Sequence, residues 1–88
     1  MASYSVLLTA SARREIEDLE KRVRVRVMSV VGALSDDPRP HGCEKLSALD
    51  RYRIRVGSHR VVYTIDDAVV TVVVVRVGHR RDVYRRKG

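Results

Sequence analysis

The chain has few of the features that mark extracellular, metal-binding or membrane proteins. Its single cysteine, Cys43, can form no internal disulfide and has no Cys or His companions at zinc-site spacing, which is typical of a reducing compartment. The N-terminal segment has a short apolar run without a basic segment before it. No stretch approaches the roughly 20 apolar residues of a membrane span. The sequence therefore predicts a soluble, cytoplasmic protein with no membrane partner.

Several catalytic motifs are also missing. The sequence contains no glycine-rich phosphate loop, no helical histidine pair for a metal and no serine nucleophile elbow. Its two acidic pairs, Asp36-Asp37 and Asp66-Asp67, fall where a helix should stop and where a turn should form. We therefore expect neither a metal site nor a cofactor.

Positive charge is abundant. The 18 Lys and Arg residues exceed the 11 Asp and Glu residues, so the formal net charge is +7. A surface of that sign attracts phosphate backbones or acidic protein segments. Arginine outnumbers lysine fifteen to three. A GC-rich coding sequence would explain that bias equally well, but it would not explain where the arginines lie.

The 88 residues suffice for a single domain, 1–88. A β-rich run at residues 3–9 precedes an amphipathic helix with Thr9 or Ser11 as N-cap. Alternating valines at 23, 25 and 27 are compatible with a strand. A helical face running from Val23 to Leu34 fits better, because the preceding segment has no turn residues to start a hairpin. The loop "SDDPRPHG" ends this second helix.

From Leu46 onward the pattern has period two and indicates strands. "RYRIRV" and "HRVVYTI" flank a Gly57-Ser58 turn, and "AVVTVVVVRV" is apolar enough for a central strand covered on both faces. The predicted fold is α+β, in the order β-α-α-β-β-β. Its two N-terminal helices pack on one face of a small, mainly antiparallel sheet, whose other face is open. Residues 85–88 should form a basic mobile tail.

The hairpin register predicts a cluster of arginines on the open face. With Gly57-Ser58 as the turn, Arg55 lies opposite Arg60 and Arg53 points to the same side. Facing like charges destabilise a strand pair by up to about 1 kcal/mol. A bound phosphate would relieve this repulsion, and the fixed donor geometry of arginine suits phosphate. Arg51 alone is better explained as a solvated surface residue.

A second group of polar residues follows the last strand, in "VGHRRDVY". His79 has a side chain that can exchange protons near neutral pH. Arg80 or Arg81 could complete a phosphate clamp, although one of them can instead pair with Asp82. Tyr84 could stack on an unpaired base or fold the tail back onto the core.

These motifs resemble those of the RelE/ParE toxin superfamily, especially its RelE branch. The resemblance extends from "YSVLLTASARREIEDL" to Tyr84 and is strongest in "YRIRVGSHRVVYTID" and "VVVRVGHRRDVY". It implies the toxin of a type II toxin-antitoxin pair, a metal-independent endoribonuclease that cuts mRNA in the ribosomal A site. The ribose 2′-oxygen attacks the adjacent phosphate, and the products are a 2′,3′-cyclic phosphate and a 5′-hydroxyl. By position, the resemblance implies catalytic roles for Arg53, Arg55, Arg60, Arg80 and Tyr84.

The chain departs from the best-known RelE proteins, which have lysines at positions 53 and 55. Because arginine stays charged at any working pH, Arg55 is a poor general base. Either electrostatic stabilisation and alignment of the 2′-oxygen dominate, or His79 transfers the proton. The chain after Tyr84 is also too short for a substantial C-terminal helix.

Two other functions remain open, a ParE-like poison of DNA gyrase and a non-catalytic nucleic-acid-binding module. The expected partners are an acidic, RelB-like antitoxin that wraps the helical pair and a sheet edge, and the ribosome with its A-site mRNA. The toxin-antitoxin complex could also bind operator DNA through the antitoxin. We expect Arg51 and Arg81 to assist in binding RNA phosphates.

Overall fold

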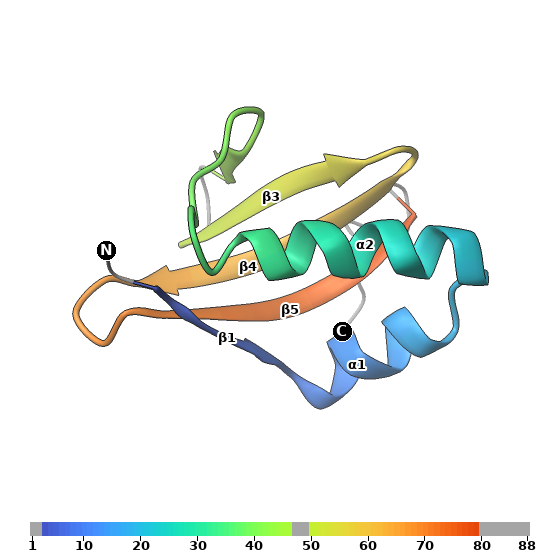
Figure 1. The fold of residues 1–88 in the computed structure, drawn as a ribbon, viewed down its shortest axis with the longest axis horizontal. Coiled ribbons are helices and arrows are strands. Elements are labelled where there is room, and N and C mark those ends of the chain that lie inside the picture. Colours follow the sequence, from blue (N-terminus) through green and yellow to red (C-terminus); the bar gives the residue numbers. More distant parts are fainter. Residues whose placement is uncertain (1–2, 47–49, 80–88) are drawn as a thin grey trace.

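The computed structural model describes residues 3–46 and 50–79 of the 88-residue chain. In this part, two helices lie on one face of a five-stranded sheet, and α2 crosses that face in Figure 1. The predicted α+β fold is confirmed, with one additional short strand before the hairpin. The elements in chain order are β1 (Ser5–Leu8), α1 (Ala10–Glu17), α2 (Lys21–Ala33), β2 (Glu44–Leu46), β3 (Arg51–Val56), β4 (His59–Asp66) and β5 (Thr71–His79).

The strand order in the sheet is β1-β5-β4-β3-β2. Only the β1 and β5 pair is parallel, and the other pairs are antiparallel. β5 therefore lies inside the sheet, as its long valine run predicted. On its helix side Val72, Val74 and Val77 are buried, whereas Val73 and Val75 on the rest of the strand are only half-buried. The prediction that both faces of β5 are covered is thus correct for the helix face alone.

Both helices form where the apolar periodicity placed them. Thr9 is the N-cap of α1, and its side-chain oxygen accepts a hydrogen bond from the Ala12 backbone N–H at 3.0 Å. Val27 and Val31 are buried on one side of α2, which excludes the alternative of a strand in this segment. α1 ends at Glu17, with Asp18 as its C-cap, and α2 begins at Lys21. The break between the two helices thus lies in a segment that has no turn residue in the sequence. Neither described helix combines the length and apolar character needed to cross a bilayer.

The β3-β4 hairpin has the predicted register. Arg55 lies opposite Arg60 and Val56 opposite His59. Gly57 adopts a φ of +64°, a left-handed conformation that glycine tolerates without steric cost. The hairpin residues expected to face the helices all belong to the core or pack against it: Tyr52, Ile54, Val56, Val61, Tyr63 and Ile65.

Candidate nucleic-acid interface

The arginines of the hairpin lie on the sheet face opposite the helices. Successive side chains of a strand point to opposite faces, and the residues alternating with the arginines pack into the core. The arginine face therefore contains Arg51, Arg53 and Arg55 from β3 and Arg60 from β4. This confirms the predicted placement of the cluster, while the role of each arginine stays a prediction.

Arg55 and Arg60 form a cross-strand pair near the hairpin turn. Arg55 is exposed and forms no ion pair with another described residue, and Arg60 is half-buried. Gly78 of β5 lies on the other side of Arg60 and, being glycine, places no side chain of its own on the arginine face. The two guanidinium groups repel each other in the folded chain, and an anion bound between them would remove that repulsion.

Arg53 lies deeper than the prediction of an open face suggested. Its side chain is 11% exposed, and its guanidinium forms an ion pair with the carboxylate of Glu44. Glu44 lies directly opposite Arg53 on the edge strand β2. Glu44 carries no recognisable signal in the sequence, because a three-residue strand is too short to show periodicity. The charge of Arg53 is therefore paired with a carboxylate of the protein itself.

Two of the β3 arginines, Arg53 and Arg55, line a hollow on the surface. It is lined by His41, Gly42, Glu44, Arg53, Ile54 and Arg55. The imidazole of His41, in the loop before β2, and the carboxylate of Glu44, on β2, thus lie beside the arginines of β3. Neither group was named as a candidate from the sequence.

Arg76 of β5 is bound by an acid on the opposite edge of the sheet. Its Nε donates to Glu15 Oε2 at 3.0 Å, and the backbone N–H of Val77 donates to Glu15 Oε1 at 2.7 Å. Glu15 belongs to α1, so this carboxylate joins the helical hairpin to the end of β5. Because the partners are more than 60 residues apart in sequence, no local pattern could have revealed the contact.

His79 lies on the other face of the sheet from Arg55 and Arg60. It pairs with His59 across β4 and β5, two residues beyond the buried Val77. The two imidazole rings are in edge contact, with centroids 5.8 Å apart. Strand alternation therefore separates His79 from the arginine face, although both lie at the same end of the sheet.

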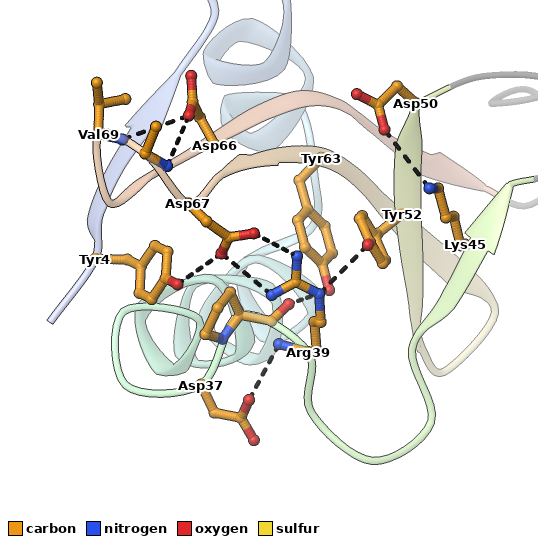
Figure 2. A network of polar contacts seen from close by, with 12 residues as sticks. Tyr4, Asp37, Arg39, Lys45, Asp50, Tyr52, Tyr63, Asp66, Asp67 and Val69 are labelled. Carbon is orange, nitrogen blue, oxygen red and sulfur yellow. Dashed lines mark hydrogen bonds and ion pairs between the residues drawn. The ribbon is translucent and has the colours of Figure 1, made fainter. Parts of the chain in front are cut away.

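A polar network fixes the loop that connects α2 to β2. Arg39 forms an ion pair with Asp67 at 2.9 Å, Asp67 accepts a hydrogen bond from the Tyr4 hydroxyl at 2.7 Å, and Arg39 Nε donates to the Tyr52 hydroxyl at 3.3 Å (Figure 2). The hydrogen bonds from Arg39 and then Tyr4 lower the pKa of the Asp67 carboxyl. The contact with Asp67 also raises the pKa of the Tyr4 phenol. These contacts position the chain segment that leads into Glu44.

A buried tyrosine of β4 also holds this loop in place. The Tyr63 hydroxyl donates to the backbone carbonyl of Pro38 at 2.9 Å, and its ring is fully buried and stacked on Tyr52 (Figure 2). Burial raises the pKa of the Tyr63 phenol above its ordinary value. Together with Arg39, this hydrogen bond holds the loop against the sheet.

The described residues contain no cluster of three or more His, Cys, Asp or Glu side chains that could hold a metal ion. Cys43 is a half-buried free thiol. The predicted site residues Arg80, Arg81 and Tyr84 and the predicted tail at 85–88 lie outside the described residues. Their roles rest on the sequence alone.

Comparison with known proteins identifies related toxins over nearly the whole chain. The family model described as the ParE toxin of the type II toxin-antitoxin system parDE matches residues 6–84. Toxin RelG of Mycobacterium tuberculosis is 39% identical, with 94% of this chain and 98% of RelG covered. Among solved structures, the toxin-antitoxin complex RelBE2 of M. tuberculosis contains a chain with a TM-score of 0.80 and 35% identity, covering 93% of this chain and 97% of that one. A chain of the intact Escherichia coli RelBE complex has a TM-score of 0.77 and 29% identity, covering 88% and 96%.

Proposed function

Because the chain belongs to the ParE toxin family and is a RelE-type toxin of a type II toxin-antitoxin system, we propose that it is a ribosome-dependent mRNA endonuclease of the cytoplasm. The observation that carries this proposal is the cross-strand pair of Arg55 and Arg60 on the arginine face. A pair of facing cations costs stability, and the most direct compensation is a phosphate bound between them.

The proposed reaction is an internal transfer at one phosphate of the mRNA. The ribose 2′-oxygen attacks the adjacent phosphorus, loses its proton and displaces the 5′-oxygen of the next nucleotide, which takes up a proton. The products are a 2′,3′-cyclic phosphate and a 5′-hydroxyl. Arg55 and Arg60 stabilise the additional negative charge on the phosphate, and Arg53, held by Glu44, supports them from the adjacent position of the sheet.

The remaining candidate residues bind the RNA around the scissile phosphate. Arg80 extends the phosphate clamp, Tyr84 stacks on or orients a base, and Arg51 and Arg81 bind flanking phosphates. Arg55 cannot accept the 2′ proton, because guanidinium stays charged. Alignment of the 2′-oxygen and charge stabilisation therefore carry the reaction unless His79 reaches around the sheet end to transfer the proton.

Mapping of cellular mRNA ends tests this function. Wild-type toxin, Arg60→Ala and the control Arg22→Ala are expressed under a tightly repressed promoter, and new 5′ ends are mapped by sequencing. Arg22 is an exposed residue of α2, away from the arginine face. We expect cuts within codons for wild type and Arg22→Ala, and a loss of about 100-fold or more for Arg60→Ala. Uncut mRNA in wild-type cells, or equal cutting by Arg60→Ala, contradicts the proposal. His79→Asn in the same experiment separates the two proton routes.

A second candidate is the poisoning of DNA gyrase, and the name of the matching family model favours it. The two functions give different responses after induction. A DNA-damage response without new mRNA ends would identify the gyrase poison. Growth without either response would leave a non-catalytic binding module.

The proposed partner in the cell is an acidic, RelB-like antitoxin. The related RelBE2 and E. coli RelBE structures are toxin-antitoxin complexes. This chain has a net charge of +7, and α2 has four basic and no acidic residues. An acidic segment that packs on the helical pair and a sheet edge would neutralise this charge. The complex would then contact operator DNA through the antitoxin.

A further inference from the structure

Two of the arginines on the sheet lie in one row and are each held by an acid at an edge. Val62 of β4 pairs with Arg53 of β3 on one side and with Arg76 of β5 on the other. Arg53 is bound by Glu44 of β2, and Arg76 is bound by Glu15 of α1. This row of Arg53, Val62 and Arg76 is called the bracketed row below.

The bracketed row lies next to the proposed phosphate site. Arg60 and Arg55 form the neighbouring row with Gly78, two residues further along each strand. Side chains two residues apart on a strand project from the same face. A guanidinium released from the bracketed row would therefore share the face on which Arg55 and Arg60 lie.

Besides binding Arg76, Glu15 completes the hydrogen bonding at the edge of the sheet. β1 pairs with β5 only as far as Leu8 and Val74, so beyond that point β5 has no strand partner on this side and is paired only with β4. Thr9 and Glu15 take the place of the missing strand, the first with its hydroxyl near the Val75 carbonyl and the second as acceptor for the Val77 N–H. One carboxylate thus satisfies an edge donor and binds Arg76.

The burial of Val62 and Arg53 explains why the charge of Arg53 needs a partner, and Arg76 beside them is partly buried. Val62 is 2% exposed between the two arginines, and the Arg53 side chain is 11% exposed. A buried guanidinium without a counter-charge is strongly unfavourable, whereas one bound to a carboxylate is tolerated. The apolar stems of both arginines can then cover Val62 while their charged groups point to opposite edges.

We propose that Glu15 and Glu44 are positioning residues that hold Arg76 and Arg53 back from direct contact with the RNA, so that among the arginines on the sheet only Arg55 and Arg60 contact the scissile phosphate. This inference rests on the proposed RNA-cleaving function. It adds that two arginines of the same face make no direct contact with the scissile phosphate, and that the acids which bind them set the number of phosphate contacts.

The binding test uses an uncleavable, fully 2′-O-methylated single-stranded RNA and the full chain. Glu15→Gln keeps an oxygen that can accept the Val77 N–H but loses the ion pair, and Glu44→Gln likewise releases Arg53. Each released arginine adds a phosphate contact, so the slope of log K against log salt should steepen by about 0.7. Glu17→Gln is the matched control, because Glu17 is an exposed acid of the same helix α1 and is in none of the ion pairs among the described residues.

Two further measurements separate positioning from simple loss of structure. The double variant Glu15→Gln with Arg76→Gln should return the salt slope to the wild-type value. Ribosome-dependent cleavage should show a kcat reduced by about 10- to 100-fold in Glu15→Gln and Glu44→Gln, without a rise in KM. Glu17→Gln should cleave like wild type.

The proposal is overturned if either bracket variant has the salt slope of Glu17→Gln, or if removing Arg76 fails to restore the wild-type slope. A wild-type protein that binds RNA with these slopes but cuts no mRNA would refute the proposed function while leaving the positioning roles intact. The two failures are therefore distinguishable.

Discussion

Tyr63→Phe tests how firmly the buried tyrosine holds the loop that leads to Glu44. The substitution removes one oxygen from a fully buried ring and leaves the Pro38 carbonyl without the donor it has at 2.9 Å. A hydrogen bond of this kind contributes about 1 kcal/mol, and an unsatisfied buried acceptor costs about 1–3 kcal/mol. We expect the free energy of unfolding to fall by about 1–2 kcal/mol.

The expected fall in melting temperature is about 5–15 °C, because 1 kcal/mol corresponds to about 4–8 °C in a domain of this size. Tyr52→Phe is the matched control, since it deletes the same atom from the ring stacked on Tyr63 at a centroid distance of 5.9 Å. The Tyr52 hydroxyl accepts its bond from Arg39 at an exposed position, so its loss should cost only a few tenths of a kcal/mol. Thermal unfolding followed by circular dichroism measures both variants. Equal losses of stability for the two would refute the reasoning.

The same variant makes a prediction about alkaline pH. Burial raises the pKa of Tyr63 above its ordinary value of 10.0, so only the unfolded chain ionises this phenol just above that pH. The stabilisation by neutral Tyr63 is therefore complete below pH 10 and is lost as pH rises toward the folded-state pKa, at about 1.4 kcal/mol per pH unit. The free energy of unfolding of wild type minus that of Tyr63→Phe should fall with this slope between pH 9 and about 11. An unchanged difference across that range would contradict it.

Two smaller predictions concern the turn and the surface network. Gly57→Ala should destabilise by about 1–2 kcal/mol, because φ is +64°, whereas Gly32→Ala on the exposed side of α2 should stabilise by about 0.5–1 kcal/mol; melting temperatures that move in the same direction would contradict this. The pKa of the Asp67 carboxyl should lie below its ordinary value of 3.8, because Arg39 and Tyr4 donate hydrogen bonds to it, and Arg39→Gln should raise that pKa. Asp67 therefore stabilises the fold above its unfolded pKa, and this contribution is lost as pH falls through the folded-state pKa. Carboxyl NMR titration checks the order of the two values.

The hairpin could be predicted because its information is local. Period-two alternation and the Gly57-Ser58 turn fix the register, and the register alone places Arg55 opposite Arg60. The N-cap at Thr9 and the helical face of Val27 and Val31 are equally local features. Each of these predictions was confirmed.

The acids that bind the arginines could not be predicted, for a different reason in each case: Glu15 is distant from Arg76 in sequence, whereas Glu44 is only nine residues from Arg53 but lies on a strand too short to show periodicity. Glu15 and Arg76 are 61 residues apart, and Glu44 lies on a strand of three residues. The burial of Arg53 likewise depends on its neighbours across the sheet and not on its own alternation. The position of His79 is a different case, since counting two residues from the apolar Val77 already places it on the helix face.

The two rows of the sheet lead to a consistent account of the charge on the arginine face. If every arginine there served only to solvate the surface, acids would be as useful beside Arg55 as beside Arg53, and both rows would be neutralised. Instead, carboxylates from two edges bind Arg53 and Arg76, while the exposed Arg55 faces Arg60 and forms no ion pair with another described residue. Acids therefore bind the two arginines of the bracketed row, while the Arg55 side chain stays exposed, where an RNA phosphate can reach it. This difference favours a phosphate site over a solvated surface, and it places that site at the end of the sheet from which the sequence continues into Arg80 and Tyr84.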